Sequence, residues 1–214
     1  MKLVIGNKNY SSWSLRPWLA MKMAGIVFDE ERIVLDRPDT KANILRHSPS
    51  GKVPCLIDGD LTVWDSLAIC EYVNEAYAGG RLWPAERAAR ATARAVTAEM
   101  HAGFAPLRMN LSMDIRSRKP ARGAEAQRLV GVQDDISRIV AVWTAALEAS
   151  GGPLLFGEFC IADAFYAPVV TRFVTYGVAL PPLLAAYCER VFALPPMRAW
   201  VAAAQAEVEE LTDH

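Results

Sequence analysis

Residues 52–69 read KVPCLIDGDLTVWDSLAI, and this stretch decides the fold of the first third of the chain. Two apolar runs, 53–57 and 61–64, flank the sequence DGD, which typically joins two antiparallel strands. An Asp-Ser pair comes next, and both residue types are favoured where a helix begins. The stretch therefore predicts a β-hairpin followed directly by a helix that starts at Ser66.

The residues before the hairpin alternate strand-like and helix-like runs. We expect strands at residues 3–5 and 31–35 and helices at residues 14–24 and 41–47. Pro17 is expected in the first turn of its helix, where a missing N–H costs little. Together with the hairpin, the order is β-α-β-α-β-β-α, which predicts an α/β thioredoxin-like domain over residues 1–78.

The residues after the hairpin lose all strand character. AGGRLWP at 78–84 is the expected linker, and from Ala85 the chain is rich in Ala, Arg and Glu. Apolar residues recur at three- and four-residue steps through the later segments. We therefore expect an all-α domain over residues 85–214, with helices in 85–113, 123–147, 161–176, 183–192 and 195–211.

The composition bounds the class of protein. Of 214 residues, 52% are hydrophobic and 22% charged, and the net charge of −1 gives no reason to expect nucleic acid or an acidic membrane as partner. The first apolar run is too short for a signal peptide, and none is long enough to span a bilayer. The four scattered cysteines fit a reducing compartment, so we expect a cytoplasmic protein. We expect no metal, because metal-ligand spacing is absent among the cysteines and histidines, which are Cys55, Cys70, Cys160, Cys188, His47, His101 and His214.

The first motif with chemical potential is YSSWSLR at residues 10–16, between the first expected strand and helix. N–H groups gather at a helix start, and the helix dipole favours an anion there. A hydroxyl of Ser11 or Ser12 can donate to a thiolate at this point. A serine in the same place can also do no more than cap the helix, and both interpretations are open.

Two further motifs lie in the stretch quoted first. Pro54 opens a strand; a cis bond before it would turn the Val53 backbone outward to pair with a peptide ligand, whereas a trans bond would make it an ordinary turn proline. Asp65 and Ser66 either cap the third helix or bind the ammonium and carboxylate of an α-amino acid head group.

In their order and spacing, these motifs resemble the cytosolic glutathione S-transferase superfamily, whose glutathione-binding signature is Val-Pro before a hairpin and acid-Ser opening a helix. CIAD at 160–163 is similar to the family's Ser/Thr-x-x-Asp capping box, and LPPMRAW at 194–200 is similar to the start of its last helix. The resemblance covers essentially the whole chain. The loop at 10–16 resembles the serine-type classes, zeta and theta, in a bacterial-style member.

The resemblance implies glutathione as co-substrate. Val53 would bind its cysteinyl part through the main chain, Pro54 would be cis, Lys52 would reach the glycyl carboxylate, and Asp65 and Ser66 would hold the γ-glutamyl end. A theta-like alignment makes Ser12 the residue that activates the thiol, a zeta-like alignment makes it Ser11, and Tyr10 is the alternative donor. We prefer Ser12, because it lies closer to the helix start.

The chain departs from the family pattern at four places. Asp65 is shorter than the commoner Glu or Gln, and Cys160 replaces Ser or Thr, so that Asp163 is left to accept from the Cys160 N–H. Trp13 stands where the zeta class has Cys, which puts maleylacetoacetate isomerase activity in doubt. The loop has no Cys, which argues against the cysteine-type classes.

The second substrate of this family lies between the loop and the helical domain. The candidates for contacting it are Trp13, Phe104, Arg108 and Tyr166, with Leu107, Leu111 and Tyr176 as further ones, and each of them can instead be a packing residue. The resemblance implies a homodimer that adds the glutathione thiolate to small hydrophobic electrophiles. Trp64, Tyr72 and Met100 are apolar residues available for its interface. The alternatives are a glutathione-dependent cis–trans isomerase and a non-catalytic binding module.

Overall fold

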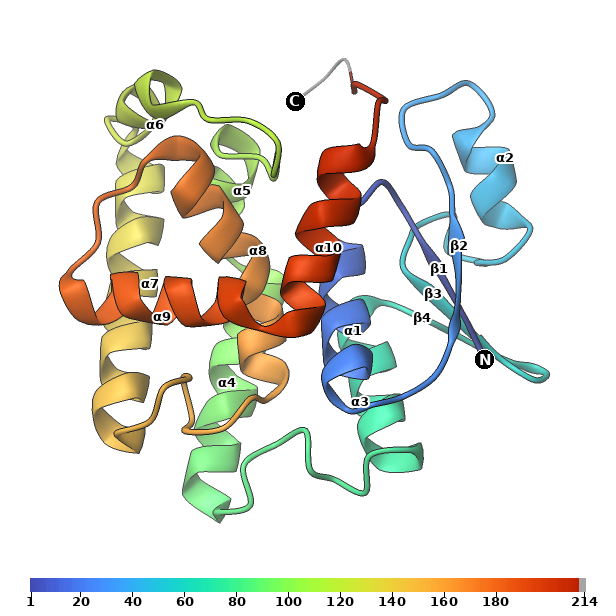
Figure 1. Cartoon of the computed structure of the whole chain (residues 1–214), viewed down its shortest axis with the longest axis horizontal. Helices are drawn as coiled ribbons and strands as arrows, with labels where there is room; N and C mark the ends of the chain where they lie inside the picture. The colour runs from blue at the N-terminus through green and yellow to red at the C-terminus, as the bar shows by residue number, and fades with distance from the viewer. Residues whose placement is uncertain (212–214) are drawn as a thin grey trace.

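A computed structural model describes residues 1–211 of the chain, and His214 lies outside them. The N-terminal domain is a four-stranded sheet with helices (Figure 1), in the predicted order β-α-β-α-β-β-α. Its elements are β1 (Lys2–Ile5), α1 (Ser12–Met23), β2 (Asp29–Arg32), α2 (Thr40–Leu45), β3 (Cys55–Asp58), β4 (Leu61–Trp64) and α3 (Ser66–Ala76).

The sheet has the order β2-β1-β3-β4. β1 pairs in parallel with β2 and antiparallel with β3, and β4 closes the hairpin against β3. Side chains alternate across β1, as a strand requires. Leu3 and Ile5 enter the large core with α1 and α3, whereas Val4 packs on the opposite face with Ile44 of α2. Both faces of the sheet are therefore covered, and the predicted fold class is confirmed.

Several predicted boundaries in this domain were displaced, those of α1 and β2 among them. α1 begins at Ser12, two residues before the predicted start, so Pro17 lies inside the helix rather than in its first turn. It removes the N–H that would have bonded to the Trp13 carbonyl. β2 covers Asp29–Arg32 rather than residues 31–35. This charged strand is an edge strand, and charged side chains are tolerated at a sheet edge.

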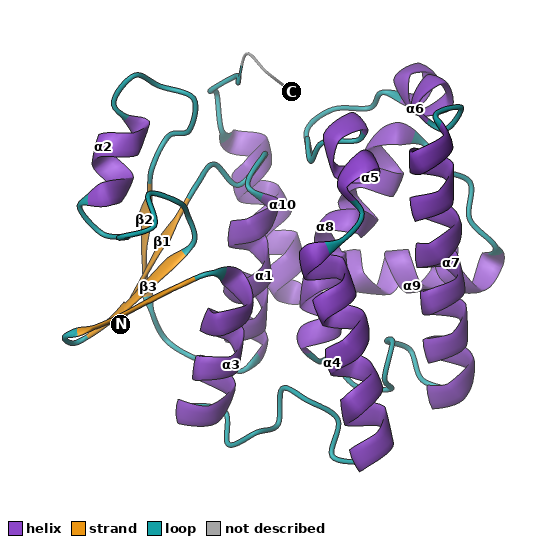
Figure 2. Cartoon of the chain, turned by 180° about the vertical axis from the view of Figure 1, so that it is seen from behind, coloured by secondary structure: helices purple, strands orange, loops and turns teal. Residues whose placement is uncertain are grey.

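Where the structure describes it, the second domain is built of helices and contains no β-strand (Figure 2). Its helices are α4 (Arg87–Ala102), α5 (Ala105–Asn110), α6 (Pro120–Ala126), α7 (Val130–Ser150), α8 (Ile161–Tyr176), α9 (Pro182–Ala193) and α10 (Pro195–Ala206). Within residues 1–211, no helix combines the length and apolar character needed to cross a membrane. All four cysteines are buried free thiols.

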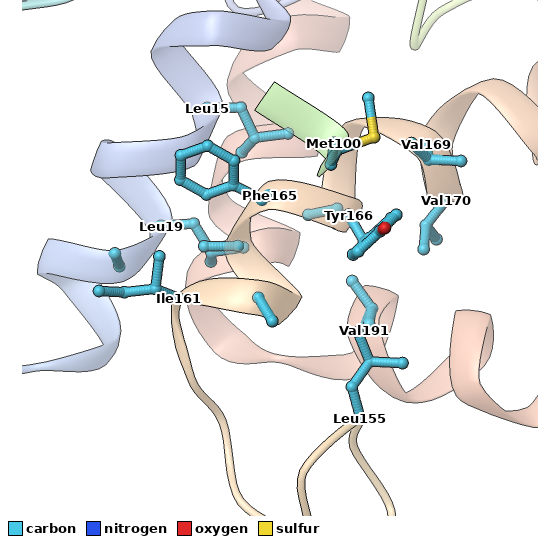
Figure 3. Packing of buried hydrophobic residues seen from close by; sticks show 14 of the residues in the cluster. Leu15, Leu19, Met100, Leu155, Ile161, Phe165, Tyr166, Val169, Val170 and Val191 are labelled. Carbon is cyan, nitrogen blue, oxygen red and sulfur yellow. The ribbon is translucent and has the colours of Figure 1, made fainter. Parts of the chain in front are cut away.

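Helix α8 is the centre of the molecule, because nearly all of its residues are buried. Leu15 and Leu19 of α1 pack beside Ile161 and Phe165 of α8 (Figure 3). Met100 of α4 joins the same cluster. One continuous apolar core therefore runs through both domains.

The start of α8 is held by Asp163, which is fully buried. Its carboxylate accepts from the Cys160 N–H at 3.0 Å, the Leu155 N–H at 3.1 Å and the Tyr187 hydroxyl at 3.2 Å. The predicted bond from Cys160 to Asp163 is thus confirmed. Burial raises the pKa of the Asp163 carboxyl to about 6, although these three donors oppose the shift.

Candidate functional site

A cavity of about 760 Å³ lies between the two domains. The N-terminal domain contributes the loop after β1 and the segment before β3. The helical domain contributes α5, the segment after it, and single residues of α6 and α8. The lining residues are Tyr10, Ser11, Ser12, Trp13, Leu35, Ile44, Gly51, Lys52, Val53, Ala105, Arg108, Met109, Ser112, Met113, Arg122 and Arg172.

The two loop serines differ in their hydrogen bonds. Ser11 is the N-cap of α1, but within the described chain its side chain makes no cap bond. Its Oγ lies 2.7 Å from Ser14 Oγ, which also accepts from the Gly6 N–H at 3.1 Å. Among residues 1–211, no hydrogen-bond partner engages Ser12 Oγ, although Ser12 lines the cavity. The cap interpretation is therefore wrong for both side chains, and the Ser12 hydroxyl is available to a ligand.

The same loop is anchored from the other end of the chain, which the sequence did not indicate. The Glu207 carboxylate accepts from the Lys8 N–H at 2.7 Å and from the Asn9 N–H at 3.0 Å. The Trp200 ring nitrogen donates to the Lys8 carbonyl at 2.9 Å. These bonds fix the backbone that leads into Ser11 and Ser12. Arg116 donates to the Tyr10 hydroxyl at 3.0 Å, so this phenol is held at the side of the loop.

The segment before β3 carries the predicted cis peptide bond between Val53 and Pro54. Lys52 and Val53 line the cavity, whereas Pro54 is buried beside them. The structure thus brings together four of the residues predicted to contact glutathione: Ser11, Ser12, Lys52 and Val53.

Asp65 and Ser66 lie outside the lining of the cavity. Asp65 caps α3, because its Oδ1 accepts from the Leu67 N–H at 2.8 Å and the Ala68 N–H at 3.2 Å. Ser66 is buried, and its hydroxyl has no hydrogen-bond partner among the described residues. The cap interpretation holds for Asp65. The Ser66 hydroxyl is a buried polar group without a partner among the described residues, which is uncommon in folded proteins.

A contact between Asp65 and His101 of α4 was not predicted. Asp65 Oδ2 lies 3.3 Å from His101 Nε2. Burial lowers the pKa of His101, and the charge of Asp65 opposes this shift. The His101 ring also meets Trp13 edge-on, with the centroids 5.3 Å apart. Through Trp13, the start of α3 adjoins the cavity.

The candidates for contacting a second substrate separate into two groups. Trp13 and Arg108 line the cavity. Phe104 and Tyr166 do not: Phe104 is buried, and Tyr166 is fully buried against Trp143, with its hydroxyl donating to the Val96 carbonyl at 3.1 Å. Phe104, the N-cap of α5, and Tyr166 of α8 therefore lie in the core and not in the cavity lining. The same holds for Leu107, Leu111 and Tyr176.

Arg172 is a lining residue that the sequence interpretation missed. It is 3% exposed and lies on the most buried helix, α8. Its sequence signal was available, since it is the single charged residue in the otherwise uncharged run of residues 164–176. A lone cation in such a run is rarely buried without a partner.

Comparisons with known proteins agree with this architecture. A family model described as glutathione S-transferase, N-terminal domain, matches residues 10–76, and one described as glutathione S-transferase, C-terminal domain, matches residues 90–203. A stringent starvation protein A homolog from Pasteurella multocida is 26% identical over 172 residues, which cover 78% of this chain and 75% of that protein.

Two other similar proteins cover most of the chain. One is named a probable maleylacetoacetate isomerase from Caenorhabditis elegans and is 25% identical, covering 80% of this chain and 78% of its own length. The other is the crystal structure of a glutathione transferase homolog from Burkholderia gl BGR1 with bound glutathione. It superposes with a TM-score of 0.73 at 25% identity and covers 96% of this chain and 98% of that one.

Proposed function

Because the chain belongs to the glutathione S-transferase family, we propose that it binds glutathione in the interdomain cavity and adds its thiolate to a small electrophile. One observation carries the proposal. The cavity brings the hydroxyl of Ser12, at the start of α1, together with Val53 beside the cis bond, and leaves room for a second reactant against α5 and α8.

The electrostatic task of the site is to ionise the thiol. A free cysteine thiol has a pKa of about 8.5, so only a few per cent is thiolate at neutral pH. The Ser12 hydroxyl and the N–H groups at the start of α1 stabilise the anion and so lower that pKa. Holding both reactants in one cavity supplies the remaining advantage through proximity.

The other residues bind the peptide. Lys52 pairs with the glycyl carboxylate, the Val53 main chain pairs with the cysteinyl unit, and Ser66 donates to the γ-glutamyl end. In this proposal Asp65 Oδ1 continues to cap α3. Asp65 Oδ2, which faces His101, binds the ammonium group of glutathione. An ammonium at this oxygen forms a direct charge pair with the carboxylate, beside the His101 ring.

Glutathione-dependent isomerisation is the second candidate function, because a similar protein is named a probable maleylacetoacetate isomerase. Among the described residues, no contact in the cavity favours isomerisation over addition. Trp13 lines the cavity where the zeta class has Cys, and it fills space with an aromatic ring. The fold also fits a cytoplasmic homodimer. Trp64 is 48% exposed on the edge strand β4 and is available to an interface, whereas Met100 is fully buried and is not.

We expect calorimetry to detect binding of reduced glutathione and to show a marked loss of affinity in Ser66→Ala. Removing a hydrogen bond to a charged ligand group costs on the order of 1.5–3 kcal/mol. Ser137→Ala on the exposed side of α7 is the matched control and should bind as the wild type does. Equal affinity in the wild type and Ser66→Ala would remove Ser66 from the site, and absence of binding in the wild type would refute the proposed function.

A further inference from the structure

Three arginines meet at the helical-domain side of the cavity, and each keeps unpaired donors. Within the described chain, hydrogen-bond partners are absent for all three guanidinium nitrogens of Arg16, for Arg108 Nε and for Arg172 Nη1. Arg16 and Arg172 are almost fully buried, and Arg108 is half-buried. Arg108 and Arg172 both line the cavity, whereas Arg16 lies behind Trp13.

The three cations repel one another. The pKa of Arg16 falls to about 9, first because of burial and then because of the charges of Arg172 and Arg108. Burial and Arg108 likewise lower the pKa of Arg172 to about 10. These shifts mark three positive charges within electrostatic reach of each other and poorly solvated.

No acidic side chain in residues 1–211 forms an ion pair with any of the three. The negative charge of Asp135 acts on Arg108 and opposes the lowering of its pKa. However, Asp135 Oδ2 accepts a hydrogen bond from the Leu107 N–H at 2.9 Å. The negative charge of Asp65 raises the pKa of Arg16. However, one oxygen of Asp65 caps α3 and the other faces His101. Residues 1–211 therefore supply the cluster with no counter-charge in direct contact.

Structural roles account for only part of these arginines. Arg16 lies over the Trp13 ring at 4.1 Å and against the Phe165 ring at 4.7 Å, which are cation–π contacts. Arg172 Nε donates to the Leu111 carbonyl at 2.9 Å and so ties α8 to the end of α5. Neither role uses Arg172 Nη1 or Arg108 Nε. Leaving charged donors buried and unpaired is costly unless an anion joins them.

We propose that Arg108 and Arg172 form a subsite for a carboxylate on the second substrate, so that the electrophile is an anionic molecule. This inference rests on the proposed function, because it assigns the second-reactant side of the same cavity. The planar guanidinium fork matches a carboxylate in two-point geometry. Arg16, behind Trp13, adds positive potential without touching the ligand.

The glycyl carboxylate of glutathione is assigned elsewhere. Lys52 comes from the N-terminal domain and lines the cavity beside Val53. Arg108 and Arg172 come from α5 and α8 of the helical domain. The site thus has two cationic ends, one for each reactant.

The reaction is balanced for an unsaturated carboxylate. The thiolate sulfur forms a bond to one alkene carbon, and the π electron pair moves to the other carbon. That carbon takes up a proton equivalent to the one the thiol lost, so the product is a thioether carboxylate and no oxidant or reductant is needed. The carboxylate keeps its charge throughout and serves only as the handle.

The binding test uses an unreactive pair of ligands, 3-benzoylpropionate and its uncharged analogue 3-benzoylpropionamide, titrated by calorimetry into the glutathione-loaded protein. We expect the carboxylate to bind about tenfold or more tightly than the amide in the wild type. Arg108→Met and Arg172→Met should each remove most of that preference. Arg87→Met, on the exposed start of α4, removes one positive charge away from the cavity and should keep the preference.

The outcomes separate this inference from the proposed function. Glutathione titrated alone tests the latter, and it should bind to Arg108→Met as it does to the wild type. Equal binding of the carboxylate and the amide, or no binding of either, overturns the carboxylate subsite even when glutathione binds. A loss of glutathione affinity in Arg108→Met also overturns it, because the arginines would then serve glutathione. Arg108 is half-buried, so its variant remains informative if Arg172→Met does not fold.

The kinetic test uses 3-benzoylacrylate and 3-benzoylacrylamide as electrophiles. We expect kcat/KM for the carboxylate relative to the amide to fall about tenfold in Arg108→Met, with Arg108→Lys restoring part of it through its charge. An unchanged ratio in Arg108→Met contradicts the inference.

Discussion

Ser12 and Ser11 are neighbours in sequence but have different tasks at the start of α1. Ser11 is tied to Ser14, and Ser14 in turn holds the Gly6 N–H. Ser12 lines the cavity without a hydroxyl partner among residues 1–211. A hydroxyl that need not give up an existing bond is the better donor to a developing anion. The geometry thus supports the theta-like choice of Ser12 over the zeta-like choice of Ser11.

We expect Ser12→Ala to lower the rate at neutral pH by roughly 10²-fold while glutathione affinity changes little. The physical reason is a higher pKa of the bound thiol, which leaves less thiolate at pH 7. The measurement is the pH dependence of the rate in Ser12→Ala, Ser11→Ala and Tyr10→Phe. If only Ser11→Ala shifts the profile, the zeta-like alignment is correct, and if only Tyr10→Phe does, the serine assignment fails.

Single residues show where sequence interpretation stops. The resemblance to the family implied the cis bond before Pro54, and the capping-box motif at 160–163 indicated the acceptor role of Asp163. The contact between Asp65 and His101 and the position of Arg172 were not predicted, since each depends on how α4 or α8 is rotated against the first domain. Contacts between distant segments carry no local signal.

Asp163 holds the start of helix α8 in place. The carboxylate satisfies two backbone N–H groups and one phenol while it is excluded from water. Desolvation is the larger influence on its pKa, and the three hydrogen bonds oppose it. The start of α8 is thus fixed by the Asp163 carboxylate, whose ionised form is destabilised by burial.

This balance predicts a pH-dependent contribution to stability. The pKa of Asp163 is about 6 in the folded chain, above its usual value of 3.8, so the folded state binds the proton more readily than the unfolded state does. Its contribution is therefore greatest below pH 4 and is lost as the pH rises through about 6. Between pH 4.5 and 7.5 the loss should be about 2 kcal/mol.

Urea unfolding of the wild type and Asp163→Asn at both pH values isolates this term, because the other titrating groups cancel. We expect the wild type to exceed the variant by less at pH 7.5 than at pH 4.5. A difference that does not change with pH would show that Asp163 is ionised in both states throughout this range.

Element types were easier to predict than element ends. The hairpin at β3 and β4 and the long helices α7 and α8 follow from turn residues and apolar spacing, which are properties of a few neighbouring residues. The start of α1 and the position of β2 were misplaced. The loop before α1 is held by Glu207 and Trp200, which are nearly 200 positions away along the chain and give no local signal.

At the scale of the whole molecule, the two predicted domains share one core. The α1–α8 contact joins them, and the linker is not a free hinge: Leu82 and Trp83 are buried in it. The Leu82 N–H donates to Asn74 and its carbonyl accepts from the Ile161 N–H, at 2.9 and 3.0 Å. The site therefore lies between two domains that pack directly against each other.

We expect the chain to unfold in a single cooperative transition, because neither domain can bury its apolar surface without the other. Differential scanning calorimetry should give equal calorimetric and van't Hoff enthalpies, and near- and far-ultraviolet circular dichroism should change together. Two resolved transitions would mean that the shared core contributes less than each domain's own packing.

The pH titration of the thiolate absorbance of glutathione bound to the wild-type protein tests the central claim most directly. It reports binding and activation at once, and it requires no knowledge of the electrophile. We predict a midpoint well below the value of about 8.5 for a free thiol, and a midpoint displaced upward in Ser12→Ala. A wild-type midpoint equal to that of free glutathione, measured with the peptide bound, would contradict the account, because the start of α1 would then not stabilise the thiolate.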